Sequence, residues 1–259
     1  MKKMIALLLA ALMICAMFTG CGEKGTTLKS VQKAGKLTIA TSPDFPPFES
    51  LGDNNEVVGI EIDVLNLICE QLGVTLEINQ MDFDSVLPGV QAGKFDVGVS
   101  GISVTEKRQK NVLFTDPYCL AAQAIVVTEG SSITCKADLE GKKVSVQTGT
   151  TAESFCMDNG YDVSSFAANS DAQTALTSGK VDAWVIDDLT AADMVKVYNA
   201  AGGDQLVILD EAMTTEPYAF AFAKDSALTA QFDEALGELL ADGTVAAIFE
   251  KYGVLYVAP

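Results

Sequence analysis

The chain has no histidine, a single tryptophan, and about half as many basic as acidic side chains. Without histidine it cannot form the Ser/His or Cys/His pairs that activate a nucleophile, nor the usual histidine-containing zinc sites. Its 17 Lys and Arg residues against 35 Asp and Glu residues give a formal net charge of −18. This acidity argues against nucleic acid and anionic membrane surfaces as partners. We expect neither a metal nor another cofactor.

The chain also lacks a long apolar run. The apolar segment at residues 4–18 is short, and two lysines precede it. That segment cannot span a bilayer with its own polar flanks, so residues 1–20 are predicted to be a secretory signal peptide. Phe18–Cys21 resembles a bacterial lipobox, with Phe in place of the usual Leu. The resemblance implies a lipid on Cys21, and an ordinary signal with an accidental cysteine is the alternative. Residues 21–29 are expected to form a flexible, lipid-anchored tether.

Cysteine is scarce in the remainder of the chain. Four cysteines lie beyond the predicted lipidation site, at Cys69, Cys119, Cys135 and Cys156. An exported protein is permitted to form disulfides, but four cysteines allow three complete pairings and the sequence does not choose among them. Cys69 lies within an amphipathic pattern and is predicted to be a small core residue.

What the chain does contain is an alternation of strand and helix patterns. The stretch at residues 36–41 alternates as a strand, residues 62–73 place apolar side chains on one helical face and end at a glycine, and residues 74–79 form the next strand. Apolar residues make up 49% of the chain, so a sizeable core is available. At this length the chain has room for one long domain or two compact lobes.

One short pattern occurs twice. Gly93-Lys94-Phe95-Asp96 and Gly179-Lys180-Val181-Asp182 each follow a short predicted helix and precede an apolar strand. The repetition indicates the same α/β unit in two lobes. Such units form mainly parallel sheets covered by helices, and their ligands bind at the carboxyl ends of the strands. Those ends are Ser100-Gly101 and Asp187-Asp188.

Eight motifs, taken in order, carry a resemblance to a known family. The chain resembles the extracytoplasmic solute-binding proteins of the polar amino acid family, which are receptor components of ABC importers with a two-lobed type II periplasmic-binding fold. The similarity covers essentially all of residues 30–253. The motifs are PPFE (46–49), GIEIDV (59–64), MDFDSVLPGVQAGKFDV (81–97), GISVTEKR (101–108), FTDPY (114–118), QTGTTAE (147–153), VDAWVID (181–187) and DGTVAAIFEKYG (242–253).

The resemblance implies an α/β fold in which each lobe is a mainly parallel sheet flanked by helices. Lobe I is expected to combine residues 30–121 with residues 214–259, and lobe II to comprise residues 122–213. Two strand-like crossings, near residues 120–127 and 215–223, would form the hinge.

A free α-amino acid is a zwitterion, which needs a forked donor for its carboxylate and an anion for its ammonium group. Arg108, within a patch that also holds Lys107 and Lys110, matches the family's carboxylate-binding arginine, and the two lysines are expected to be solvated. Asp187 matches the residue that receives the ammonium, although it could instead cap the helix that follows. Ser103 matches a residue that contacts both groups. The backbone amides at Thr150 and Thr151 are expected to face the carboxylate at a helix start.

The pocket for the ligand side chain follows from the same alignment. Two aromatic residues are expected to sandwich the side chain, and neutral residues to line the remaining walls. Relatives that bind cationic ligands often carry an acid where this chain has Ser42, so a neutral amino acid is favoured. The directions of Asp44 and Glu49 are left open. The expected wall residues are Phe45, Phe83, Ser42, Gln147 and Ile186, with Ser100 and Gly101 at the strand end.

Three functional classes are compatible with these residues. The first is a monomeric receptor that binds a free amino acid outside the cytoplasmic membrane and delivers it to permease subunits of an ABC transporter. The second is an exported enzyme of dehydratase type, for which Asp187 or Glu153 would have to serve as general acid or base. The third is a lipoprotein that presents its ligand to a sensory partner. The receptor is favoured because an ammonium partner explains Asp187 better than catalysis does, and we expect no enzymatic activity.

Overall fold

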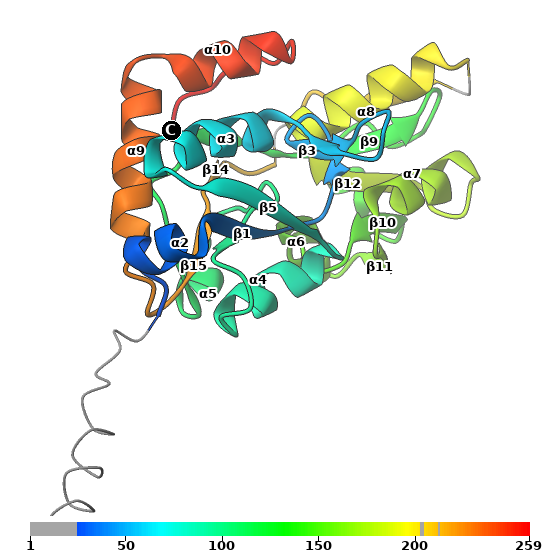
Figure 1. Cartoon of the computed structure of the whole chain (residues 1–259). Coiled ribbons are helices and arrows are strands. Elements are labelled where there is room, and N and C mark those ends of the chain that lie inside the picture. The colour runs from blue at the N-terminus through cyan, green and yellow to red at the C-terminus, as the bar shows by residue number, and fades with distance from the viewer. Residues whose placement is uncertain (1–24, 203–204, 212) are drawn as a thin grey trace, which may run out of the picture.

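The computed structural model describes residues 25–202, 205–211 and 213–259 (Figure 1). The predicted signal peptide at residues 1–20 and the predicted lipidation site Cys21 lie outside the described residues. Helix α2 (Leu28–Ala34) begins before the expected end of the tether at residue 29. Thr27 caps this helix, since its side chain accepts a hydrogen bond from the Ser30 backbone N–H.

Two five-stranded sheets form the centres of two lobes, as the α/β prediction required. In each sheet four strands point the same way and the fourth strand in the order opposes its neighbours. The fold class is therefore confirmed. The first sheet has the order β5 (Thr75–Gln80), β1 (Lys36–Thr41), β6 (Val97–Gly98), β15 (Ala221–Ala223), β7 (Val112–Phe114). The second has the order β11 (Asp162–Phe166), β10 (Lys143–Gln147), β12 (Ala183–Asp187), β9 (Gln123–Thr128), β13 (Leu206–Ile208).

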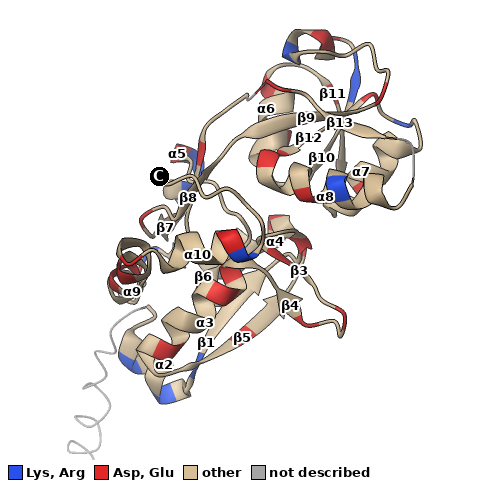
Figure 2. Ribbon diagram, turned by 90° about the horizontal axis from the view of Figure 1, so that it is seen from above, with Lys and Arg blue, Asp and Glu red and all other residues tan. Residues whose placement is uncertain are grey.

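Helices cover these sheets on both lobes (Figures 1 and 2). Helix α3 (Ile60–Leu72) illustrates the cause: Ile62, Leu65 and Ile68 lie on one face and are buried, and the helix ends where Gly73 adopts a positive φ of 72°. The first lobe also carries α4 (Phe83–Gln91), α5 (Glu106–Gln109), α9 (Thr229–Ala241) and α10 (Thr244–Lys251), besides α2 and α3. The second lobe carries the 3₁₀ helix η1 (Lys136–Leu139), α6 (Thr151–Asp158), α7 (Asn169–Thr177) and α8 (Asp188–Ala200).

The repeated Gly-Lys-apolar-Asp pattern has the same structural role in both lobes. Asp96 accepts a hydrogen bond from the Thr38 backbone N–H at 2.8 Å, and Asp182 accepts one from the Lys143 N–H at 2.8 Å. In each case the aspartate fixes the start of the neighbouring parallel strand. Gly93 also follows a helix with a positive φ of 68°, which suits a residue without a Cβ. The repeat therefore sets the helix-to-strand turn that aligns each sheet.

Strands β8 (Cys119–Ala121) and β14 (Glu216–Tyr218) form a separate antiparallel pair between the lobes. β8 leads into β9 of the second sheet, whereas β14 leads back into β15 of the first. Strands β9 and β15 oppose their neighbours because the chain arrives in each lobe from this pair. A small three-stranded sheet of β2 (Asp44–Phe45), β3 (Glu49–Leu51) and β4 (Val57–Val58) lies at the edge of the first lobe. Figure 2 shows the two lobes joined at this narrow region.

Several features of the described chain bear on the sequence predictions. Cys69, Cys119, Cys135 and Cys156 are free thiols, and Cys69 is buried as expected. Trp184 is fully buried in the core. Within the described ranges no helix has the length and apolar character needed to cross a membrane. The same residues hold no group of three or more Cys, Asp or Glu side chains arranged to ligate a metal ion.

Candidate functional site

Ten of the twelve residues predicted to bind ligand line one small cavity between the lobes. Its volume is about 10 Å³, the space of roughly one water molecule. The lobes are therefore closed upon one another, and a larger ligand requires them to separate. The ten residues are Phe45, Phe83, Ser100, Gly101, Ser103 and Arg108 from the first lobe, with Gln147, Thr150, Thr151 and Asp187 from the second.

Ser42 and Ile186 do not line this cavity. Ser42 lies behind Ser100, since its backbone N–H donates to the Ser100 hydroxyl at 3.2 Å. Ile186 is buried in the same core cluster as Trp184. Successive side chains of a strand point to opposite faces, so Ile186 cannot share the direction of Asp187, which faces the cavity. Neither residue provides a wall for a bound side chain in the closed arrangement.

Arg108 is directed toward the second lobe by a short capped helix. The Thr105 side chain accepts from the Arg108 backbone N–H at 3.2 Å and so begins α5. The guanidinium then donates from Nη1 to the Ser103 carbonyl at 2.8 Å and from Nη2 to the Gly149 carbonyl at 3.2 Å. It also lies over the Phe83 ring, 5.5 Å from its centroid. Loss of hydration at this end lowers the pKa of Arg108.

Asp187 ends strand β12 and begins helix α8, yet its side chain does not cap that helix. The neighbouring Asp188 accepts from the Leu189 N–H at 2.8 Å and from the Ala122 N–H at 3.1 Å. Asp187 instead accepts a hydrogen bond from the Gln123 side-chain amide. Burial, followed by repulsion from Glu216, raises the pKa of Asp187 well above its usual range. The Asp187 carboxyl therefore faces the cavity and does not cap helix α8.

The start of helix α6 faces the same cavity from the second lobe. Thr150 caps this helix by accepting from the Glu153 N–H at 3.1 Å, and its hydroxyl donates to the Gln147 carbonyl at 2.7 Å. Glu153 turns back to accept from the Gly149 N–H at 2.7 Å and from the Ser165 hydroxyl. Glu153 is therefore part of the turn and does not line the cavity, which removes it as a candidate acid or base.

Two polar residues of the hinge region take part in this network, and the sequence interpretation missed both. Glu216 accepts from the Ser103 hydroxyl at 2.5 Å and from the Thr151 hydroxyl at 2.7 Å. Gln123 joins Asp187 to Thr151, with its amide 3.2 Å from the Thr151 hydroxyl. The sequence signal that could have identified them is a single acid or amide in an otherwise apolar strand that crosses between the lobes. Such a residue is expected to have a buried partner.

Among the described residues, the charges around the cavity have no ion-pair partner. The described residues form two ion pairs within 4 Å, Lys36–Glu77 and Lys251–Asp63, and both pairs are partly exposed. The Arg108 guanidinium donates to two carbonyl oxygens, and Asp187 accepts from the Gln123 amide. Asp187 is buried, and a buried charge without an opposite charge is costly. This arrangement suits a ligand that brings both an anionic and a cationic group.

A comparison with protein families matches residues 37–254 to the bacterial extracellular solute-binding proteins, family 3. The chain belongs to this family. The resemblance to solute-binding proteins for polar amino acids is thus confirmed. Family 3 proteins are extracellular by their description, which agrees with the expectation of a protein that acts outside the cytoplasmic membrane.

Named relatives of this family 3 protein are amino acid-binding proteins. The arginine-binding extracellular protein ArtP of Bacillus subtilis is 33% identical, over 97% of this chain and 98% of its own. The solved structure of an ancestral arginine-binding protein bound to glutamine is 41% identical, with a TM-score of 0.79, over 84% of this chain and 97% of that chain. The ancestral amino acid-binding protein AncCDT-1, a precursor of cyclohexadienyl dehydratase, is 33% identical, with a TM-score of 0.80, over 88% and 99%.

Two further carboxyls near the site of this family 3 protein, those of Asp44 and Glu49, bond elsewhere and do not line the cavity. Asp44 reaches across the lobes to the start of α7, where it accepts backbone N–H bonds from Asn169 and, at 3.2 Å, from Ser170. Glu49 is fully buried and accepts from the Ser100 hydroxyl at 2.7 Å. Burial, and then repulsion from Glu61, raises the pKa of Glu49 well above its usual range. The directions that the sequence left open are thereby settled.

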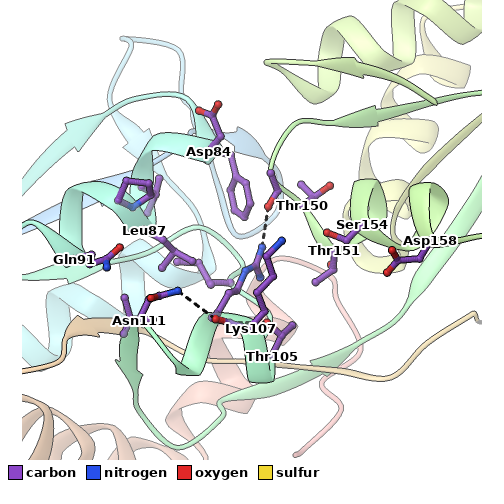
Figure 3. A pocket seen from close by; sticks show the side chains of 17 residues that line it. Asp84, Leu87, Gln91, Thr105, Lys107, Asn111, Thr150, Thr151, Ser154 and Asp158 are labelled. Carbon is purple, nitrogen blue, oxygen red and sulfur yellow. Dashed lines mark hydrogen bonds between the residues drawn. The ribbon is translucent and has the colours of Figure 1, made fainter.

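A second, larger cavity of about 450 Å³ lies beside the first, between α4, α5 and α6. Figure 3 shows Leu87 and Gln91 on one side of it and Ser154 and Asp158 on the other. Its lining contains no unpaired buried carboxyl. We therefore assign the candidate binding site to the small cavity. Arg108 lines both cavities, and the larger one therefore gives solvent access to the guanidinium end of the site.

Proposed function

We propose that this solute-binding protein binds a free α-amino acid and delivers it to the permease subunits of an ABC transporter. The observation that carries this proposal is that the charges around one interlobe cavity have no ion-pair partner in the described part of the chain. The carboxylate of the ligand would receive the guanidinium of Arg108 and the N–H groups at the start of α6. The ammonium group would be received by Asp187, with Ser103 beside both.

The ligand's side chain is proposed to be neutral. Phe45 and Phe83 supply the apolar wall, and Gln147 supplies a neutral polar one. Asp44 is engaged by backbone N–H groups, and neither Asp44 nor Glu49 lines the cavity, so neither carboxyl is presented to a cationic side chain there. ArtP is named for arginine, and the ancestral relative is bound to glutamine. The cationic amino acids are therefore the competing ligand class.

A binding role is favoured over catalysis at this site. AncCDT-1 is described as a precursor of a dehydratase, so the enzyme alternative has a structural neighbour. Of the two acid or base candidates in this chain, Glu153 belongs to the turn before α6. Asp187 alone remains, and it stands where an ammonium group would need it. We propose that the protein releases its ligand unchanged.

The protein is further proposed to act as a monomer tethered to the membrane through a lipid on Cys21. The tether would continue from the described helix α2 at the outer side of the first lobe (Figure 1). The lobe boundaries proposed are residues 30–121 with 214–259 for lobe I and 122–213 for lobe II. The antiparallel pair of β8 and β14 supports this division, since the two described crossings of the chain pair there.

Isothermal titration calorimetry with the twenty common L-amino acids tests the proposal. We expect binding of at least one neutral amino acid and none of its decarboxylated amine, because the amine cannot use Arg108. Mass spectrometry of the recovered ligand should show no change of mass. Tightest binding of arginine, lysine or histidine would overturn the neutral side chain alone. An absence of binding by all twenty would overturn the proposed function.

A further inference from the structure

Glu216 occupies the hinge pair and belongs to neither of the two large sheets. It is 7% exposed, and one of its carboxylate oxygens, Oε2, touches both lobes at once. That atom accepts from Ser103 at the end of the first lobe's site, at 2.5 Å, and from Thr151 at the start of α6, at 2.7 Å. Both partners line the interlobe cavity. Glu216 therefore supports the cavity from the hinge side.

The negative charge of Glu216 is not neutralised by these contacts. Its second oxygen, Oε1, accepts from the Thr214 hydroxyl at 3.0 Å, so the partners of its carboxylate are all uncharged hydroxyls. A carboxylate has about four lone-pair sites, and three are used here. No basic side chain of the described chain lies within ion-pair distance of it. One acceptor position, on Oε1, remains available, and the charge has no ion-pair partner among the described residues.

Asp187 lies in the same electrostatic environment. The Gln123 side chain donates both to Asp187 and to the Thr151 hydroxyl that Glu216 accepts. Repulsion by Glu216 contributes to the raised pKa of Asp187, after burial. Both carboxylates also act electrostatically on Arg108. Asp187 and Arg108 line the cavity, and Glu216 lies directly behind the lining residues Ser103 and Thr151. A second acidic group therefore lies beside the site.

An ammonium group has three N–H donors and no acceptor, so a buried ammonium needs three acceptors. Asp187 supplies one acceptor group and the Ser103 hydroxyl oxygen another. We propose that Glu216 is the third, a second anionic contact for the ligand's α-ammonium group that makes the site select amino acids over the corresponding 2-hydroxy acids. The proposal rests on the proposed function. It adds a specificity-determining residue to the site that Arg108 and Asp187 define.

The charge of Glu216 is distinguishable from its role in joining the lobes. A glutamine at this position retains an oxygen that accepts from Ser103 and Thr151, and it has nearly the same shape. Glu216→Gln therefore removes the charge while it preserves the contacts between the lobes. A 2-hydroxy acid has the same carboxylate and side chain as the amino acid but no positive charge. Only the amino acid should respond strongly to the substitution.

The test titrates wild type and Glu216→Gln with two probes: the common L-amino acid that binds wild type most tightly, and the 2-hydroxy acid with the same side chain. We expect the amino acid to bind the variant about tenfold to a hundredfold more weakly, as for one charge-assisted hydrogen bond. The hydroxy acid should change by less than about threefold, since its α-oxygen is uncharged. Glu211→Gln, the same charge change on the segment before β14, serves as the control and should bind like wild type.

Three results would overturn the inference. Equal weakening of both probes would show that Glu216 only joins the lobes, and unchanged binding of the amino acid would show no contact. Equal weakening by Glu211→Gln would show a long-range charge effect. If Glu216→Gln does not fold, Glu216→Asp, which keeps the charge but withdraws it by one methylene, must still lower the preference for the amino acid over the hydroxy acid. Failure of wild type to bind any amino acid would overturn the proposed function instead.

Discussion

Replacement of Arg108 by lysine tests how the site binds a carboxylate, because it retains the positive charge and removes the planar, forked set of N–H donors. A guanidinium carries five N–H donors in fixed directions. Two of them are used for the carbonyls of Ser103 and Gly149, at 2.8 and 3.2 Å, and the other donors remain for a ligand carboxylate. A lysine ammonium has three donors around one atom. It cannot serve both carbonyls and also bind a carboxylate through two parallel bonds.

The expected cost follows from the number of bonds that are lost. Losing one charge-assisted hydrogen bond to the ligand weakens binding by about 1.5–3 kcal/mol. Because each 1.4 kcal/mol is tenfold in the dissociation constant, Arg108→Lys should bind the cognate amino acid about tenfold to a hundredfold more weakly. The packing of the guanidinium over Phe83, at 5.5 Å, is also lost, which affects the unliganded protein as well. The free energy of unfolding should therefore be measured alongside binding.

Calorimetric titration of purified wild type and Arg108→Lys with the same amino acid provides the measurement. Lys110→Gln is the matched control, since Lys110 belongs to the same basic patch and is exposed. We expect Lys110→Gln to bind like wild type. If Arg108→Lys also binds like wild type while folded, the carboxylate is not held by this guanidinium and the reasoning from the unpaired charges is wrong.

Three further predictions concern closure, pH and anchoring. Asp44→Ala removes two backbone hydrogen bonds between the lobes at the start of α7, so the ligand-free variant should show a larger radius of gyration by solution scattering; equal curves would contradict this. The pKa of Glu49 is raised above its ordinary value of 4.5, so folding retains a proton there and wild-type stability should fall as pH rises from about 4.5. Urea unfolding of Glu49→Gln should show a shallower fall than wild type, with the exposed Glu70→Gln as control, and an equal slope would refute the cause. Cys21→Ser should move the protein from the membrane fraction to the soluble fraction of cells, and membrane retention would exclude a lipid at this residue.

Helix boundaries and turns could be predicted from the sequence, because they depend on residues that are close together along the chain. The spacing of Ile62, Leu65 and Ile68 predicted helix α3, and a glycine that accepts a positive φ predicted its end. Thr105 caps the short helix that carries Arg108, and threonine is a preferred residue at such a position. The two Gly-Lys-apolar-Asp patterns predicted a repeated unit, because the same short sequence makes the same turn and the same strand contact in each lobe.

Most of the site residues could also be predicted from the sequence, because they lie at the ends of predicted strands. Parallel strands meet a ligand at their carboxyl ends, so Ser100, Gly101 and Asp187 were placed near one another by topology alone. The sequence left the direction of single side chains less certain. Ile186 was expected in the wall, but the alternation of strand β12 turns it into the core. One residue's shift along a strand changes its face, and an alignment does not resolve that shift.

The sequence by itself determined the family, the two-lobed α/β class, the absence of histidine chemistry and the likeness of Arg108 to a carboxylate receptor. Only the tertiary structure decided which side chains complete the site. Glu216 meets Ser103 across 113 positions of sequence and Thr151 across 65, and Asp44 meets the start of α7 across 125. Contacts of this kind leave no periodic pattern, because they depend on how two lobes close rather than on how one segment folds. The physical reason is that burial and charge pairing are properties of the assembled cavity.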